Sequence, residues 1–113
     1  MSTPYNIEIY RTSTGKEPYT EWEINLDKVA MIKIDARLTR IRQTGNVGVC
    51  KPVGDGVYEL KFDFGPGYRI YFGLQKETNM ILLLGGSKKG QQRDINKSKE
   101  YWKDHLLAKR GKK

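Results

Sequence analysis

Residues 58–93 read YELKFDFGPGYRIYFGLQKETNMILLLGGSKKGQQR and, together with Val57, hold three successive runs of strand-forming residues. The runs are Val57–Phe64, Tyr68–Leu74 and Met80–Leu84, separated by Gly65-Pro66-Gly67 and by Glu77-Thr78-Asn79. Glycine allows the positive φ of a tight turn, and proline has no backbone N–H to donate to a neighbouring strand. Both junctions therefore predict hairpin turns. The stretch therefore predicts a three-stranded antiparallel meander.

The segment before the meander predicts one strand and two helices. Apolar and polar residues alternate over residues 5–10, as in a half-buried strand. Pro18 suits the first position of a short helix, whose apolar stripe consists of Tyr19, Trp22 and Leu26. A second helix is predicted over Lys28–Gln43 and ends at Gly45-Asn46. Its apolar face consists of Ala30, Ile34, Leu38 and Ile41.

The segments on either side of the meander are less regular. Val47–Asp55 contains proline and glycine and is predicted to be a loop, with Cys50 a small buried or half-buried residue. The glycines and lysines of residues 85–90 lack the GxxxxGK[ST] spacing, which excludes a nucleotide-binding P-loop. A last helix is predicted from Gln91–Asp94 to about Lys109. Its core-facing stripe consists of Ile95, Trp102 and Leu106.

These elements follow one another in the order β-α-α-β-β-β-α. They predict one α+β domain over residues 1–113, with an N-terminal strand, an α-hairpin, the meander sheet and a C-terminal helix. The helices are expected on one side of the sheet. Residues 110–113 are expected to be a disordered basic tail.

Composition excludes several classes of protein. No apolar run approaches the ~20 residues of a membrane span, and residues 1–11 lack the basic and apolar regions of a secretory signal. One cysteine and one histidine allow neither an internal disulfide nor a Cys/His zinc site. A cytoplasmic protein with no metal and no cofactor is expected, with no membrane partner.

Charge is unevenly distributed along the chain. Its formal net charge is +8, and residues 1–86 carry 11 basic and 10 acidic residues whereas residues 87–113 carry 10 and 3. Such asymmetry indicates nucleic acid, an acidic protein or anionic lipid as a partner. A solvated lysine-rich helix is the simpler alternative.

The meander also concentrates cations on one face. Strand alternation places Lys61 and Arg69 on the same side of adjacent strands, and Lys88 and Lys89 follow the next strand. Further candidates for a stacking ring or a proton donor are Tyr71, Tyr101 and His105. The structural alternative is an ordinary cross-strand pair between Glu59 or Asp63 and Arg69.

Three motifs resemble those of a known family: VYELK at residues 57–61, GPGYRIYFG at residues 65–73 and LLLGGSKKGQQRDI at residues 82–95. They are similar to the RelE/ParE toxin superfamily, and most of all to its phage-derived, HigB-like "addiction module killer" branch. The likeness covers nearly the whole chain. It implies a toxin of a type II toxin–antitoxin module that arrests translation, with a helix-turn-helix antitoxin as its partner in a hetero-oligomer.

Many proteins of this superfamily are mRNA interferases, which are ribosome-dependent endoribonucleases that need no metal. The ribose 2′-hydroxyl attacks the adjacent phosphate and expels the 5′-oxygen, so clustered cations stabilise the charge that develops. The resemblance implies that Arg69 contacts the scissile phosphate and that Lys61 acts as a base or phosphate ligand. Lys88 and Lys89 follow the last strand, at the position where relatives carry a basic residue that stabilises charge or acts as an acid. Other basic residues expected to bind RNA are Lys51, Arg93 and Lys97.

The same resemblance leaves two alternatives open. A ParE-like protein on this fold would inhibit DNA gyrase, and a non-catalytic module would bind RNA or the ribosome through the same cations. RelE-type enzymes carry two lysines on the first meander strand, whereas this chain has Glu59 and Lys61. The four basic positions favour the nuclease over the gyrase inhibitor, while Glu59 favours the non-catalytic module.

Overall fold

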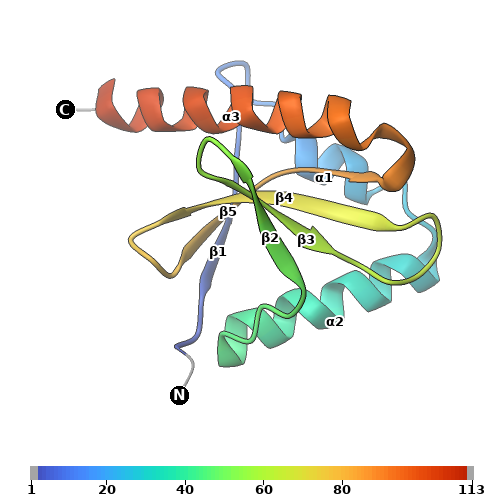
Figure 1. The fold of residues 1–113 in the computed structure, drawn as a ribbon. Coiled ribbons are helices and arrows are strands. Elements are labelled where there is room, and N and C mark those ends of the chain that lie inside the picture. The colour runs from blue at the N-terminus through green and yellow to red at the C-terminus, as the bar shows by residue number, and fades with distance from the viewer. Residues whose placement is uncertain (1–2, 112–113) are drawn as a thin grey trace.

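The computed structural model describes residues 3–111. In chain order the elements are β1 (Asn6–Ile9), α1 (Pro18–Glu23), α2 (Lys28–Thr44), β2 (Cys50–Gly54), β3 (Val57–Lys61), β4 (Tyr68–Gln75), β5 (Asn79–Ser87), the 3-10 turn η1 (Lys88–Gly90) and α3 (Gln91–Gly111). The predicted α+β class is confirmed, and the elements are shown in Figure 1.

The five strands form one sheet in the order β1-β5-β4-β3-β2. Because β3, β4 and β5 are successive antiparallel neighbours, the predicted meander is confirmed. The N-terminal strand β1 lies parallel to β5, from Asn6 opposite Asn79 to Ile9 opposite Leu82. The sheet therefore has β1 and β2 as its edges.

The prediction of a loop over Val47–Asp55 is wrong, because part of it forms the edge strand β2. β2 pairs with β3, with Lys51 opposite Glu59 and Pro52 opposite Tyr58. Proline is tolerated there because an edge strand has a ladder on one side only. Cys50, expected to be buried or half-buried, is exposed on this edge.

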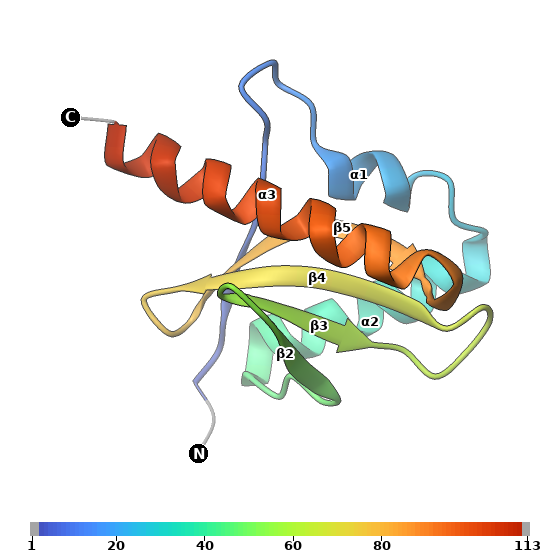
Figure 2. The same ribbon diagram turned by 45° about the horizontal axis from the view of Figure 1, so that its top comes forward.

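The helices cover both faces of the sheet, so the prediction that they lie on one side is also wrong. Figures 1 and 2 show α2 and α3 on opposite sides of the strands. The core on the α2 side consists of Tyr19, Ile34, Leu38, Ile41, Leu60, Phe62, Ile70, Phe72, Met80 and Leu82. The core on the α3 side consists of Tyr10, Val57, Tyr71, Ile81, Leu83 and Trp102. Alternation along the strands supplies both sets, as the period of two requires.

Two glycines allow two tryptophans to lie directly against the strands. A Cβ on Gly73 of β4 would come within 2.4 Å of the Trp102 ring, and a Cβ on Gly85 of β5 within 2.1 Å of the Trp22 ring. Gly85 pairs with Ile70, whose side chain belongs to the α2-side core, so Trp22 approaches from that side. The two contacts position α3 on one face and α1 on the other.

The ends of the helices follow their local sequence. Asp27 precedes α2 and its Oδ1 accepts a hydrogen bond from the backbone N–H of Ala30 at 2.8 Å. Gly45 ends α2 in the left-handed region, at φ 76°. The predicted second helix, including its end at Gly45, is thus confirmed to within one residue.

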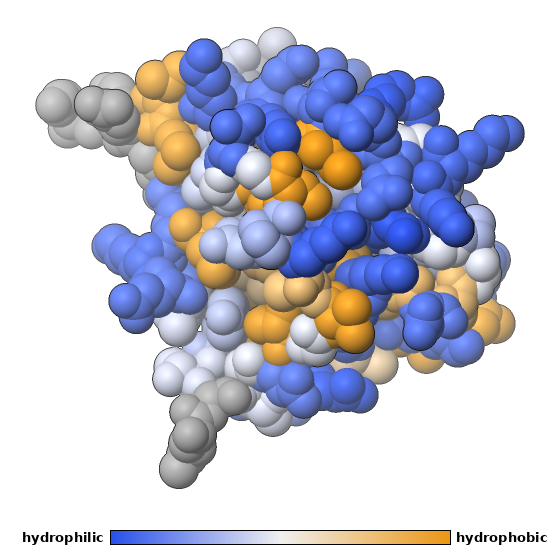
Figure 3. Space-filling view, viewed as in Figure 1, coloured by the Kyte–Doolittle hydropathy of each residue, from blue (hydrophilic) through white to orange (hydrophobic). Residues whose placement is uncertain are grey.

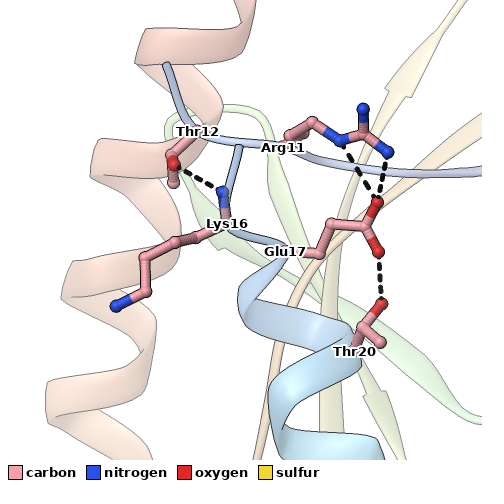
Figure 4. Close-up of polar contacts among 5 residues, drawn as sticks. All are labelled: Arg11, Thr12, Lys16, Glu17 and Thr20. Atoms are coloured by element: carbon pink, nitrogen blue, oxygen red, sulfur yellow. Dashed lines mark hydrogen bonds and ion pairs between the residues drawn. The ribbon is translucent and has the colours of Figure 1, made fainter. Parts of the chain in front are cut away.

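The turn between β1 and α1 is held by side-chain contacts (Figure 4). The Arg11 guanidinium forms an ion pair with the Glu17 carboxylate at 2.7 Å, and the Thr20 hydroxyl donates to the same carboxylate at 2.8 Å. The hydrogen bonds from Arg11 and Thr20 lower the pKa of Glu17. The Thr12 hydroxyl accepts from the Lys16 N–H, and Pro18 begins α1 as predicted.

The last helix is longer than predicted. α3 continues to Gly111, and the expected disordered basic tail of residues 110–113 stays a prediction. Lys112 and Lys113 lie outside the described residues. Trp102 is buried as predicted, but Leu106 is exposed instead of facing the core.

Replacing Gly73 by alanine is predicted to destabilise the protein by about 1–3 kcal/mol, because the new methyl group would force the Trp102 ring off β4. Urea unfolding followed by circular dichroism measures the loss. Gly90→Ala is the control, since its Cβ would meet chiefly the mobile end of the Arg93 side chain. Equal stability of the two variants would contradict this account of how α3 is positioned.

Candidate anion-binding site

The register of the meander brings three predicted cations together. Lys61, the last residue of β3, pairs directly with Arg69 of β4. Lys88 follows β5, and its backbone N–H donates to the Pro66 carbonyl at 3.3 Å. These residues line a cleft of about 510 Å³ around the loop of residues 62–67, together with the Asp63 carboxylate. We call this hollow the cationic cleft.

Arg69 is nearly buried, with 6% of its surface exposed. Its Nη1 donates to the Gly67 carbonyl, and its Nε lies 3.6 Å from Oε2 of Glu59. Among the described residues this buried Nε has no hydrogen-bond partner. The guanidinium is therefore charge-paired but retains an unused donor.

Glu59 is the acceptor at the centre of this arrangement and is 1% exposed. Its Oε2 accepts a hydrogen bond of 2.6 Å from the Gln91 side-chain amide, and its Oε1 lies 4.0 Å from Nζ of Lys51. Burying a carboxylate requires such partners. The sequence left open that Arg69 pairs with a carboxylate on the neighbouring strand, and the structure contains such a pair between Arg69 and Glu59.

A second, smaller hollow of about 180 Å³ lies beside the cationic cleft. Its lining includes Lys51, Cys50 and Glu59, and it shares Lys61 and Arg69 with the cationic cleft. Lys51 is 66% exposed at its side chain. Lys51 thus joins the same cationic surface from the edge strand that was predicted to be a loop.

Arg37 of α2 holds the end of β3 in place. Its guanidinium donates to the carbonyls of Val47 and Val49, at 3.0 and 2.8 Å, and to the carbonyl of Lys61. It also lies over the Phe62 ring, at 4.6 Å from the centroid. Arg37 therefore fixes the backbone from which the Lys61 side chain extends.

Other predicted site residues lie elsewhere. Tyr71 is fully buried beneath α3, and burial together with Glu59 and Asp94 raises the pKa of its hydroxyl, so its ring is not placed to stack on a ligand. Lys89 is exposed but is not part of the cationic cleft. Arg93 is 84% exposed at its side chain and lies 3.8 Å from Asp94 on α3.

Tyr101 and His105 lie on α3 away from the cationic cleft. His105 forms a hydrogen bond of 3.0 Å with Gln75, six residues and roughly 20 Å along β4 from Arg69. The Tyr101 ring packs on Tyr10 with the ring centroids 5.1 Å apart, and Nζ of Lys97 lies over the Tyr101 ring at 5.6 Å from its centroid. The structure therefore does not bring these residues to the cationic cleft.

Several residues of the site were not predicted from the sequence. Gln91 and Asp94 lie over the sheet beside Glu59 and Gly86, at the start of α3. Burial raises the pKa of the Asp94 carboxyl. The QQRD run at the start of α3 is a signal for polar contacts, but it does not show which face of the sheet the helix covers.

In Figure 3 the face that carries β2 in Figure 1 is mostly hydrophilic, with small separate hydrophobic patches. Within residues 3–111 no group of three or more His, Cys, Asp or Glu side chains is placed to hold a metal ion. In the same part of the chain no helix is long and apolar enough to cross a membrane.

Comparison with known proteins places this architecture in a family. A protein from Haemophilus influenzae, described as an uncharacterized protein, is 47% identical over 94 residues, which cover 82% of this chain and 90% of the relative. Residues 22–111 match the family described as phage-derived protein Gp49-like (DUF891). That range includes α2, the whole meander, the cationic cleft and α3. The chain belongs to the phage-derived Gp49-like protein family.

Proposed function

We propose that this protein is the toxin of a type II toxin–antitoxin module and acts as a ribosome-dependent mRNA endoribonuclease in the cytoplasm. Membership of a phage-derived family supports the toxin part of the proposal. The observation that carries the nuclease part is the cationic cleft, in which Lys61 and Arg69 are cross-strand neighbours and Lys88 lines the same hollow.

The arrangement suits charge that develops on a phosphate. In the proposed reaction the 2′-oxygen loses its proton and bonds to phosphorus, the bond from phosphorus to the 5′-oxygen breaks, and that oxygen takes up a proton. Fixed positive groups stabilise the extra negative charge of the intermediate. Lys61 and Lys88 are both exposed and line the cleft, so they are the amines placed to contact the phosphate and exchange protons.

Arg69 has a different role from the lysines. Because it is nearly buried against Glu59, it acts from the floor of the cleft and offers its remaining donor to a phosphate oxygen only after a shift of the side chain. Arginine presents five donors in a planar fork, so it can hold two anions on different edges. Lys51 adds charge from β2.

The Glu59–Arg69 contact also favours a second candidate, a non-catalytic RNA- or ribosome-binding module. A carboxylate beside the central guanidinium reduces the positive potential that a phosphorane would experience. Under either proposal the partners are RNA, the ribosome and a helix-turn-helix antitoxin that covers the basic surface.

Replacing both Lys61 and Lys88 by alanine is predicted to abolish mRNA cleavage and growth arrest, since both exposed amines of the cleft are lost without opening the core. The measurement is mapping of mRNA 5′ ends after brief induction of each variant. The matched control is a Lys16→Ala and Lys103→Ala double variant, which removes the same charge from exposed positions outside the cleft.

Cuts at fixed positions within translated codons, retained in the control and lost in the cleft variant, are the expected result. Cleavage that survives in the cleft variant would contradict the assignment. Growth arrest with intact mRNA and broken DNA would indicate gyrase inhibition instead. Arg69→Ala is a poorer test, because it leaves the buried Glu59 carboxylate without its arginine and destabilises the fold.

The Glu59→Gln variant is predicted to bind single-stranded RNA about fivefold more tightly at low salt, because a negative charge beside Arg69 and Lys51 is removed. Glutamine keeps an oxygen that can accept from Gln91. Fluorescence anisotropy with a labelled RNA measures the change, with Glu100→Gln as the control on exposed α3 surface. Unchanged affinity would show that Glu59 does not oppose the ligand.

A further inference from the structure

A third hollow, of about 570 Å³, lies next to the cationic cleft. It is bounded by the end of α1, the last residues of β5 and the first turn of α3. Pro66 lines both this hollow and the cationic cleft. A polymer whose phosphate occupies the cationic cleft can therefore extend around the loop at Pro66 into this hollow.

Two aromatic side chains form one wall. The rings of Trp22 and Tyr68 lie 5.9 Å apart at 73°, and both are partly exposed. Trp22 rests on Gly85, where a Cβ would come within 2.1 Å, so its position is set by close packing on β5. Partly exposed, fixed aromatic rings are the usual platforms for nucleobases in single-stranded RNA sites.

The edge of β5 forms a second wall. Among the described strands β1 pairs with β5 only as far as Leu82, so Leu84–Ser87 have a strand neighbour on the β4 side alone. Gly85, Gly86 and Ser87 line the hollow. Backbone groups along a strand edge can donate to and accept from the edge of a base.

Three charged residues belong to the lining, and one of them, Asp27, uses its carboxylate to accept from the Ala30 N–H at the start of α2. The Asp94 carboxylate lies over Gly86, where a Cβ would come within 2.0 Å of Oδ2, and it is half-buried. A carboxylate in this position accepts hydrogen bonds from exocyclic amino groups and favours bases that carry them. Arg93 lies at the rim with most of its side chain exposed, where it can contact a neighbouring phosphate.

We infer that this hollow binds one nucleobase of the RNA strand, of the kind that carries an exocyclic amino group, next to the phosphate in the cationic cleft. The base stacks on one of the two rings, Trp22 or Tyr68, meets the other at its edge, and presents its amino edge to Asp94 and the β5 edge. This inference rests on the proposed function, because it assigns a subsite of the same RNA-binding surface. A peptide strand added to β5 is the competing occupant that the experiment must distinguish.

The first experiment is an NMR titration of the isotope-labelled full chain with 5′-GMP, 5′-CMP, 5′-UMP and ribose 5-phosphate. The amides of Gly85 and Gly86 and the Trp22 indole N–H are expected to shift with 5′-GMP and 5′-CMP, weakly with 5′-UMP and not with ribose 5-phosphate. Shifts confined to Lys61 and Lys88, or none with any nucleotide, would overturn the inference. This measurement needs no substitution and so does not depend on a variant that folds.

The second experiment measures anisotropy with a labelled tetranucleotide RNA and with the same RNA carrying abasic residues. Trp22→Leu is expected to weaken binding of the base-bearing RNA about tenfold and to leave the abasic RNA unchanged. Tyr5→Leu is the matched control, since Tyr5 precedes β1 at the other end of the sheet.

The two proposals fail in different ways. If wild-type protein and Trp22→Leu bind both RNAs equally and only the Lys61→Ala, Lys88→Ala double variant is weakened, the base subsite is wrong and the phosphate site stands. If the double variant binds like wild type, with an unchanged dependence of affinity on salt, the proposed phosphate site is wrong. If the site is correct, the slope of log affinity against log salt concentration falls in magnitude by about 0.7 for each phosphate contact that is lost. A peptide that displaces no RNA but shifts Gly85 and Gly86 would assign the edge to a protein partner and overturn the inference.

Discussion

The close approach of two tryptophans to two glycines positions the elements that surround the candidate site. Trp102 lies on Gly73 and carries α3 across one face, while Trp22 lies on Gly85 and holds α1 on the other. Interiors are close-packed, so a single methyl group at either glycine cannot be absorbed without moving a helix. α3 begins beside Glu59, and Trp22 of α1 lies beside Tyr68, so both helices contribute residues to the site that these two contacts hold in place.

The position of α3 explains why the polar face of the meander is not simply an exposed cationic surface. Its first residues bring Gln91 to Glu59, and Glu59 in turn lies beside Arg69. The cations of the meander therefore divide into a buried arginine with a carboxylate partner and exposed lysines at the strand ends. Exposed lysines can be exchanged at little cost in stability, whereas the arginine and the glutamate have to be considered together.

Much of this arrangement could be predicted because it depends on local pattern. Alternation and the turn at residues 65–67 were enough to predict that Lys61 and Arg69 share a face, and the structure makes them direct partners. β2 was missed because Pro52 usually argues against a strand, which holds for inner strands but not for an edge. One apolar stripe does not specify which side of the sheet α3 covers, because that depends on tertiary packing. The sequence therefore did not predict that Tyr71 is buried or that His105 lies far from the cleft.

The same reasoning bears on what Glu59 does in the cleft. A buried carboxylate next to a guanidinium with an unused Nε donor is costly to form, since Arg69 retains an unmet hydrogen bond. A phosphate that enters between Lys61 and Lys88 would compete with Glu59 for the arginine. If it did, binding would require Arg69 to turn toward the cleft, and Glu59 would keep only its contacts with Gln91 and Lys51. Glu59 would then hold Arg69 in place when no RNA is bound. A phosphate would have to attract Arg69 more strongly than the Glu59 carboxylate does.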